Sequence, residues 1–192
     1  PPEEVVKAIS DLFGMFDDLA DEYGIYTGET VGDAYIAGQA ELPLTDENYP
    51  PNVIQFGLTM VRATQRWSIR EREPIGVRVG VHSGQCIGGI VGFDKQRYHL
   101  FGKLIHQLEL LESTAPENGL QVSSSCKAAV EQAWASDSRG SASARRRGSR
   151  TFEFSERFEP HLTTSKGEVH HFAEVGGKTY IVDAIHGLNG LE

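Results

Sequence analysis

Two carboxylates and an arginine in the first half of the chain could take part in chemistry. Glu29 and Asp33 lie close together in the run YTGETVGDAY, and Arg78 opens the run RVGVHSG. Carboxylate oxygens are the hard ligands that Mg2+ prefers, and the fork of an arginine fits two phosphate oxygens. Each also has a purely structural interpretation, because Asp beside Gly is common in turns and a solvent-facing strand arginine can pair with an acidic side chain.

Local patterns predict the elements that would position these side chains. Residues 25–38 are predicted to form two strands that turn around Val31-Gly32-Asp33, because glycine permits the turn. Residues 75–82 alternate between apolar and other side chains, which predicts the strand that carries Arg78. The remaining predictions are helices over 3–20, 52–72, 102–113 and 123–134, and short strands over 88–92 and 120–122.

The C-terminal part combines a low-complexity run with a final pair of strands. Residues 136–150, SDSRGSASARRRGSR, contain few apolar side chains and are predicted to form a disordered surface insertion. Residues 168–185 are predicted to form a closing hairpin with Gly176-Gly177 as its turn. The mixture of helices, strands and hairpins predicts an α+β fold, and we expect residues 1–192 to form a single domain.

Composition argues against several classes of protein. The net charge of −9 argues against nucleic acid as the main partner, although a nucleotide held through Mg2+ or a few arginines stays compatible. Two cysteines argue against a disulfide scaffold and fit a reducing compartment. No apolar run approaches the roughly 18 residues of a membrane span. The chain begins at a predicted helix and without Met, so we expect a segment of a longer protein, whose membrane attachment stays open.

Two other kinds of site are not supported by the residue patterns of this sequence. The glycines between Gly84 and Gly92 are not followed by Gly-Lys-Ser/Thr, so they do not form a phosphate-binding P-loop. His170 and His171 are adjacent, which places them on opposite faces of a strand, and no second ligand cluster accompanies them. A zinc site is therefore not predicted.

Three stretches together resemble the catalytic domain of class III adenylyl and guanylyl cyclases. They are YTGETVGDAY at 26–35, RVGVHSG at 78–84 continuing to Gly92, and RYHLFG at 97–102 with Glu112-Ser113-Thr114 closing the next helix. The resemblance implies a ferredoxin-like βαββαβ core, whose first strand would lie before Pro1. It also implies dimerisation with a second cyclase domain and nucleotide sites at the interface. The match fades after about residue 135.

In that family, two Asp residues hold two Mg2+ or Mn2+ ions on a nucleoside triphosphate. Asp33 matches the second of these residues, and the first would lie in the strand expected before Pro1. Two metal ions stabilise both the attacking 3′-oxygen and the leaving pyrophosphate oxygen. Arg78 matches a family arginine that contacts the triphosphate, so the resemblance adds a functional interpretation to the structural one.

The resemblance also implies a purine pocket. Glu29 matches the position that reads the base. Guanine presents donors at N1 and its 2-amino group, which a carboxylate accepts, whereas adenine presents an acceptor at N1. Adenylyl cyclases tend to have Lys there, so Glu29 favours the guanylyl branch. The second purine position is His99, which matches neither the Cys of guanylyl nor the Asp of adenylyl enzymes; an exposed strand Glu and a partly buried structural His remain the alternatives.

The predicted catalytic helix departs from the family pattern. The family has an Asn and, four residues later, an Arg, which position the ribose and stabilise transition-state charge. The matching residues are His106 and Leu110, whose spacing puts them on one helix face. Leu110 cannot donate a hydrogen bond, and losing such a contact typically costs about 10²–10³ in rate. His106 is the remaining, weaker candidate in the position of the Asn.

These matches predict a guanylate cyclase catalytic domain that converts GTP to cyclic GMP and pyrophosphate as the metal-donating half of a dimer. Its place would be inside the cell, on the cytosolic face of any membrane. One alternative is a catalytically inactive, cyclase-like dimerisation or scaffold module, and another is an adenylate cyclase half. A homodimer of this chain is expected to be nearly inactive, because both sites would lack the Arg.

Overall fold

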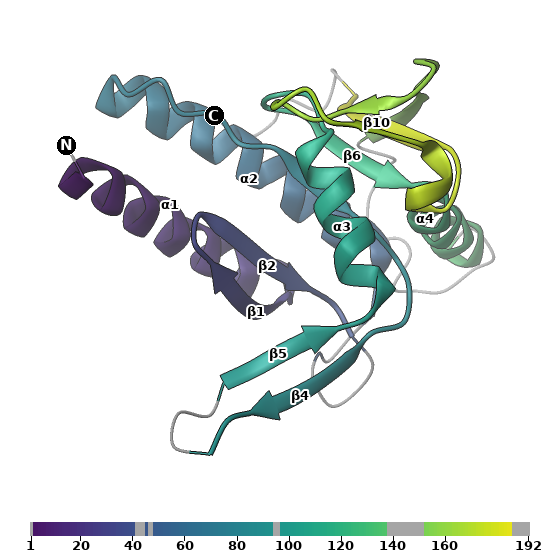
Figure 1. Ribbon diagram of the computed structural model, residues 1–192, viewed down its shortest axis with the longest axis horizontal. Coiled ribbons are helices and arrows are strands. Elements are labelled where there is room, and N and C mark those ends of the chain that lie inside the picture. Colours follow the sequence, from purple (N-terminus) through teal and green to yellow (C-terminus); the bar gives the residue numbers. More distant parts are fainter. Residues whose placement is uncertain (1, 41–44, 46–47, 94–96, 138–151, 186–192) are drawn as a thin grey trace. The chain divides into compact units, whose positions relative to one another are not determined.

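Helices and strands are mixed along the chain, as Figure 1 shows. The structure is a computed structural model, and it describes residues 2–40, 45, 48–93, 97–137 and 152–185. The chain divides into two compact units: the first unit is Pro1–Val77 with Gln85–Ile105, and the second unit is Arg78–Gly84 with His106–Glu192. The predicted α+β class is confirmed. Among the described residues, no helix is both long and apolar enough to span a bilayer.

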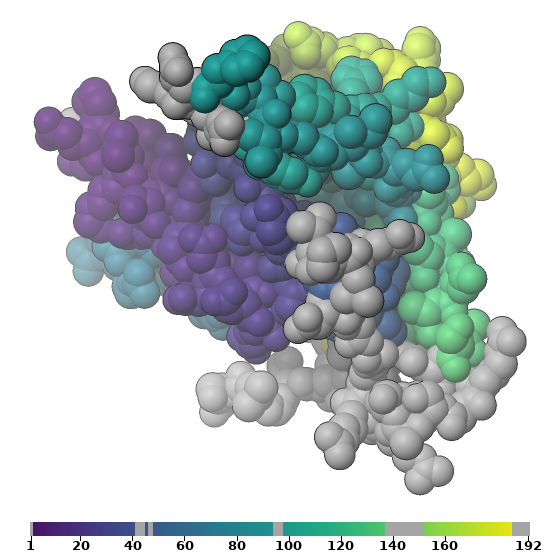
Figure 2. Space-filling view, turned by 90° about the horizontal axis from the view of Figure 1, so that it is seen from below, coloured from purple at the N-terminus to yellow at the C-terminus, as the bar shows by residue number. Residues whose placement is uncertain are grey.

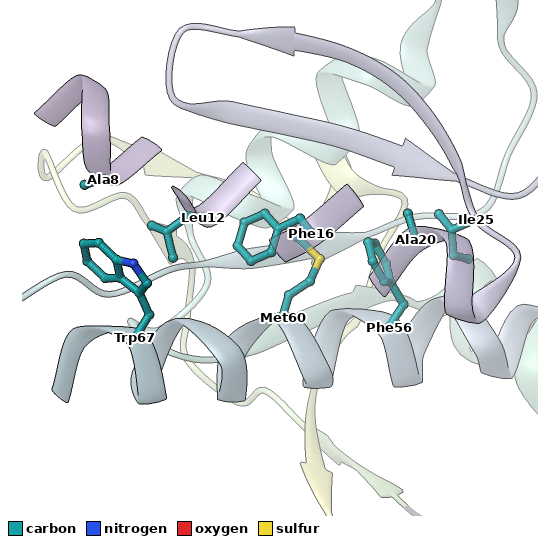
Figure 3. Packing of buried hydrophobic residues seen from close by; sticks show 8 residues of the cluster. All are labelled: Ala8, Leu12, Phe16, Ala20, Ile25, Phe56, Met60 and Trp67. Carbon is teal, nitrogen blue, oxygen red and sulfur yellow. The ribbon is translucent and has the colours of Figure 1, made fainter. Parts of the chain in front are cut away.

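Two long helices of the first unit pack through apolar faces. α1 (Pro2–Tyr23) repeats buried side chains every four residues, which places them on one face. α2 (Pro50–Glu71) begins at two prolines, which suit a first helical turn because they lack the N–H that would stay unpaired there. Figure 3 shows the two faces in contact. The shared core consists of Ala8, Leu12, Phe16, Ala20, Ile25, Phe56, Met60 and Trp67.

The strands of the first unit form two antiparallel pairs. β1 (Tyr26–Val31) turns into β2 (Ala34–Gly38), and Gly32 takes the left-handed conformation, with a φ of 63°, at that turn. β4 (Ile87–Val91) pairs with β5 (Arg97–Phe101) from Ile87–Phe101 to Val91–Arg97. β5 also lies against β1. The strands predicted over 25–38 and 88–92 are therefore confirmed.

The second unit is built on a mixed sheet with the strand order β3-β6-β10-β7. β3 (Val79–Val81) runs parallel to β6 (Leu120–Ser123), and β10 (Thr179–Ala184) is antiparallel to both β6 and β7 (Phe152–Glu156). α4 (Ser124–Asp137) follows β6 directly. The remaining short elements are β8 (Leu162–Thr163), β9 (Val169–His170) and η2 (Phe172–Val175).

β3 approaches α3 (Lys103–Ser113) backbone to backbone. A Cβ atom added to Gly80 would lie 2.4 Å from the backbone nitrogen of Glu112, far inside van der Waals contact. Only glycine fits at this crossing, so the RVGVHSG stretch needs its glycine for packing.

Three expectations differ from the structure. β3 covers only Val79–Val81 of the predicted 75–82, because its partner β6 supplies only Leu120–Val122 to the ladder. Residues 168–185 do not form a closing hairpin: β9 pairs with β8, and β10 lies between β6 and β7. Of the predicted insertion 136–150, residues 136–137 end α4, and the rest lies outside the described residues.

Candidate functional site

The backbone of β1 is irregular at Glu29. Thr27 pairs with Ala37 and Thr30 pairs with Tyr35, so Gly28 and Glu29 together oppose the single residue between those partners. An extra residue of this kind is a β-bulge, which bends the strand and re-aims a side chain. From this bulge, the Glu29 side chain reaches His99 and Leu100 of β5.

Glu29 and His99 form a hydrogen-bonded pair, although they are 70 residues apart in the sequence. The Nδ1 atom of His99 lies 2.8 Å from Oε2 of Glu29, and the Leu100 N–H donates to Oε1 at 3.4 Å. The Glu29 side chain is 18% exposed and that of His99 is 39% exposed. The two residues that resemble the purine-reading positions therefore form one partly open polar site.

Asp33 lies at the exposed turn between β1 and β2. The structure shows no hydrogen bond or ion pair between its carboxylate and any described residue. Within the described ranges, no group of three His, Cys, Asp or Glu residues could hold a metal ion. Asp33 therefore fits Mg2+ or Mn2+ chemically as one oxygen ligand, and the triphosphate and a further carboxylate would have to supply the rest.

Arg78 belongs to the second unit and pairs with the end of α3. Its Nε atom lies 3.1 Å from Oε1 of Glu112. This ion pair is the contact that the structural interpretation of Arg78 predicts. The structure shows no hydrogen bond from the two terminal nitrogens of Arg78 to a described residue, and the side chain lines a pocket of about 380 Å³ together with Arg157.

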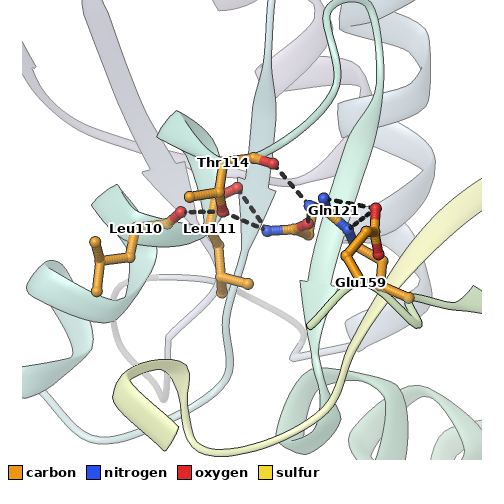
Figure 4. Close-up of polar contacts among 6 residues, drawn as sticks. Leu110, Leu111, Thr114, Gln121 and Glu159 are labelled. Atoms are coloured by element: carbon orange, nitrogen blue, oxygen red, sulfur yellow. Dashed lines mark hydrogen bonds and ion pairs between the residues drawn. The ribbon is translucent and has the colours of Figure 1, made fainter. Parts of the chain in front are cut away.

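Arg157 is a partly buried, hydrogen-bonded residue that the sequence analysis did not single out. Its guanidinium donates to the side chain of Gln121 and, at 2.7 Å, to the carbonyl of Thr114. Hydrogen bonds from Arg157 hold the pKa of Glu159 below its ordinary value. Gln121 is fully buried and donates to the Leu111 carbonyl at 3.1 Å. Figure 4 shows this network, which ties the end of α3 to β6 and β7.

His106 and Leu110 have different surroundings on α3. His106 is exposed, whereas Leu110 is 6% exposed and packs in an apolar cluster with Leu111, Leu162 and Val175. One helix face was expected to carry both towards a site. The structure instead places Leu110 in the core of the second unit, because a leucine at this position gains free energy by leaving water.

His82 is a further polar residue that the site prediction did not include. Its Nδ1 atom lies 2.8 Å from the hydroxyl of Ser123, and that hydroxyl contacts Ser125 at 3.0 Å. Burial lowers the pKa of His82, since it disfavours the charged ring. The histidine of the RVGVHSG stretch therefore links β3 to the start of α4.

Known proteins are similar to this chain in sequence. The family model described as adenylate and guanylate cyclase catalytic domain matches residues 1–162. Atrial natriuretic peptide receptor 2 of Rattus norvegicus is 31% identical over 133 residues, which are 68% of this chain and 13% of the receptor. Guanylyl cyclase C of Rattus norvegicus is 32% identical over 127 residues, which are 65% of this chain and 12% of that protein. The chain spans only a small part of either relative.

Solved structures share the fold. The guanylate cyclase domain of RhGC from Catenaria anguillulae superposes with a TM-score of 0.68 at 20% identity, over 96% of this chain and 86% of that one. The adenylyl cyclase CyaB from P. aeruginosa superposes with a TM-score of 0.65 at 16% identity, over 99% of this chain and 86% of that one. With the family model matching most of its length, this chain belongs to the adenylate and guanylate cyclase catalytic domain family.

Proposed function

We propose that this domain is a guanylate cyclase catalytic domain, which converts GTP to cyclic GMP and pyrophosphate as the metal-donating half of a dimer. The observation that carries the proposal is the exposed Asp33 carboxylate, which makes no hydrogen bond or ion pair with a described residue. The Glu29 carboxylate beside His99, which would belong to the other site of the dimer, favours the guanylyl branch. A carboxylate accepts from the N1–H and 2-amino groups of guanine and disfavours the N1 acceptor of adenine. The similarity to guanylyl cyclase C supports the same substrate.

Asp33 and Arg78 are the residues that this chain would contribute to the triphosphate. Asp33 would hold Mg2+ or Mn2+, because its exposed carboxylate has no partner among the described residues. Bound metal ions neutralise the charge that develops on the phosphate oxygens. Arg78 keeps its Nε on Glu112, which leaves its two terminal nitrogens to donate to phosphate oxygens.

The proposed half-role follows from α3. Leu110 is buried and apolar, so it cannot stabilise the transition-state charge that the family arginine would stabilise. His106 is exposed and could position a ribose hydroxyl, but it would act alone. A partner domain with the family Asn and Arg would therefore complete the site that receives Asp33, while Glu29 and His99 would belong to a second site.

The β4–β5 hairpin supports dimerisation. Its pairing register puts Ile87, Val91 and Phe101 on the same face as His99. Ile87 is 73% exposed, and the other two apolar side chains are about half exposed. Figure 2 shows the teal residues of the hairpin at the molecular surface. A second cyclase domain on this face would bury the apolar side chains. The guanylyl cyclase domain of the RhoGC fusion protein from Blastocladiella emersonii is a non-canonical dimer in one solved structure and a monomer in another.

A cyclase assay with a complementary partner tests the proposal. The domain, with any residues that precede Pro1 in its parent protein, is assayed alone and mixed with a cyclase subunit that has the Asn and Arg. Production of cyclic GMP from GTP and of cyclic AMP from ATP is measured with Mg2+ and with Mn2+. We expect cyclic GMP only in the mixture, and loss of at least about 10²-fold in rate with Asp33→Ala.

Asp18→Ala is the matched control, because Asp18 is an exposed aspartate on α1 outside the proposed site. It should leave the rate unchanged. Robust turnover by the domain alone would contradict the half-role, and preferential turnover of ATP would indicate the adenylate cyclase alternative.

A non-catalytic dimerisation module is the second candidate. The observation that favours it is the burial of Leu110 in an apolar cluster of the second unit. Dimerisation without turnover in the mixture, with either nucleotide and either metal ion, would support this module and exclude the catalytic role.

A further inference from the structure

The exposed face of α2 is basic, although the whole chain has a net charge of −9. Arg62, Arg66 and Arg70 lie at four-residue steps in the helix. Residues four apart lie on one side of a helix, so the arginines form one stripe about 12 Å long. Residues 62–73 contain four arginines and two glutamates, which leaves this segment with a net charge of +2. α2 therefore concentrates positive charge in an otherwise acidic chain.

Most of these arginines have no acidic partner. Arg62 and Arg66 are exposed, and neither makes a hydrogen bond or ion pair with a described residue. The exposed guanidinium of Arg72, whose left-handed backbone ends the helix, also makes no such contact. Arg70 differs, because its Nε atom lies 2.7 Å from Oε1 of Glu71. Three guanidinium groups at this end of α2 are therefore available to an external anion.

An isoleucine lies among the arginines. Ile69 is 79% exposed and follows Arg66 by three residues, which places the two side chains on one helix face. The other large apolar side chains of α2 are buried, and Figure 3 shows Phe56, Met60 and Trp67 directed towards α1. Among the described residues of α2, Ile69 is thus the large apolar side chain that stays open to solvent.

The chemistry of this face favours an anionic lipid surface over a protein partner. A guanidinium group donates two parallel hydrogen bonds to a phosphate or a carboxylate. The centre of a protein–protein interface is depleted in charge and usually contains aromatic side chains, whereas the described side chains on this face of α2 include no aromatic ring. Closely spaced lipid headgroups match a spread of arginines, and an aliphatic side chain can enter the boundary between headgroups and acyl chains.

We propose that the exposed face of α2, formed by Arg62, Arg66, Ile69 and Arg72, binds the surface of a membrane that contains anionic lipid. The arginines contact headgroup phosphates and carboxylates, and Ile69 inserts between the headgroups. The apolar face of α2 belongs to the core of the first unit, so the helix cannot turn to insert that face. The contact is therefore peripheral, reversible and weakened by salt. It does not depend on the proposed cyclase activity.

Co-sedimentation of this chain with vesicles tests the proposal. Vesicles of phosphatidylcholine alone are compared with an equal mixture of phosphatidylcholine and phosphatidylserine. We expect binding to the mixed vesicles only, and its loss in about 1 M salt, where the Debye length is about 3 Å. Arg62→Gln combined with Arg66→Gln should lower the partition coefficient about thirtyfold, because each arginine near an anionic surface contributes a similar, separate attraction. Ile69→Ser should also weaken binding, because the inserted apolar group is lost.

Lys166→Gln combined with Lys178→Gln is the matched control, because it removes the same charge from two exposed lysines of the second unit. It should bind the mixed vesicles as the unaltered chain does. Circular dichroism of both double variants verifies that neither has lost its fold, since all four substitutions are on the surface.

Three outcomes would overturn the proposal. The first is equal binding of the mixed vesicles by the arginine variant and the lysine control. The second is binding of phosphatidylcholine alone as strongly as the mixture, since the arginines would then not select the anionic headgroup. The third is no binding to any vesicle at low salt, together with weaker self-association of the arginine variant in sedimentation velocity. That result would assign this face of α2 to a second copy of the chain.

Discussion

Leu110 and His106 lie one helical turn apart on α3, yet only His106 is open to solvent. The position that corresponds to a family arginine has become part of an apolar cluster. A charged side chain returned to this position would have to leave water without a partner. Introducing an arginine at position 110 would therefore disturb the packing of the second unit.

Leu110→Arg should lower the free energy of unfolding by about 2–4 kcal/mol, because it places an unpaired charge in an apolar cluster. Urea denaturation followed by circular dichroism measures this change. Leu110→Met is the control and should cost less than about 1.5 kcal/mol, since the volume is kept. If the Leu110→Arg variant were as stable as the unaltered protein, position 110 would tolerate a charged side chain and the prediction would be wrong.

Buried polar groups connect the elements of the second unit. Gln121 lies in the ladder of β6, and its side chain reaches the end of α3, while Arg157 joins the same network from the end of β7. A buried amide without partners is costly, so each member of such a network depends on the others. The end of α3, which includes Glu112 and hence the partner of Arg78, is held by this network.

Arg157→Met should therefore destabilise the domain by about 1–3 kcal/mol, because Gln121 and the Thr114 carbonyl lose their donor. The urea midpoint gives the measurement. Arg62→Met, at an exposed position of α2, is the matched control and should change stability by less than about 0.5 kcal/mol. Equal midpoints for the two variants would mean that the network contributes nothing.

Local patterns predicted the helices and most strands but not their nonlocal partners. The apolar repeat of α1 and the glycine turn between β1 and β2 depend on neighbouring residues, so the sequence is sufficient there. β10 was assigned to a hairpin because its partners, β6 and β7, come from distant segments. Pairing across such distances depends on burial of the whole sheet, which no short window contains.

The sequence predicted which residues belong to the candidate site, but it did not predict how they contact one another. Glu29 and His99 were chosen separately, and nothing local indicated that they would be hydrogen-bonded. The only sign in the sequence of the bulge at Glu29 is Gly28, which is itself part of that bulge. Arg157 was not predicted because arginine side chains are ordinarily exposed, and its anchoring role depends on the buried Gln121.

At the scale of the whole molecule, the β4–β5 hairpin exposes apolar side chains that a second domain could cover. Ile87 and Phe101 face the same side of the β4–β5 hairpin, where Ile87 is mostly exposed and Phe101 is about half exposed. Ile87→Ser together with Phe101→Ser should raise the dissociation constant of the dimer at least about tenfold, because roughly 1.4 kcal/mol of apolar burial is enough for that change. Sedimentation velocity over a range of concentrations measures it.

Phe158→Ser is the control for that experiment, since Phe158 is an exposed aromatic residue of the second unit. It should leave association unchanged. If the hairpin variant and the control associate equally well, the dimer uses another surface.

The number of residues between Val91 and Arg97 sets the register of the β4–β5 hairpin and so determines which side chains lie on each face. Side chains alternate between the two faces of a strand, so a shift in pairing by one residue exchanges the faces. Such a shift would present Tyr98 in place of His99 and turn Leu100 outward in place of Phe101. One inserted or deleted residue in that connection could thus replace His99 and Phe101 on this face together, without any substitution in either strand.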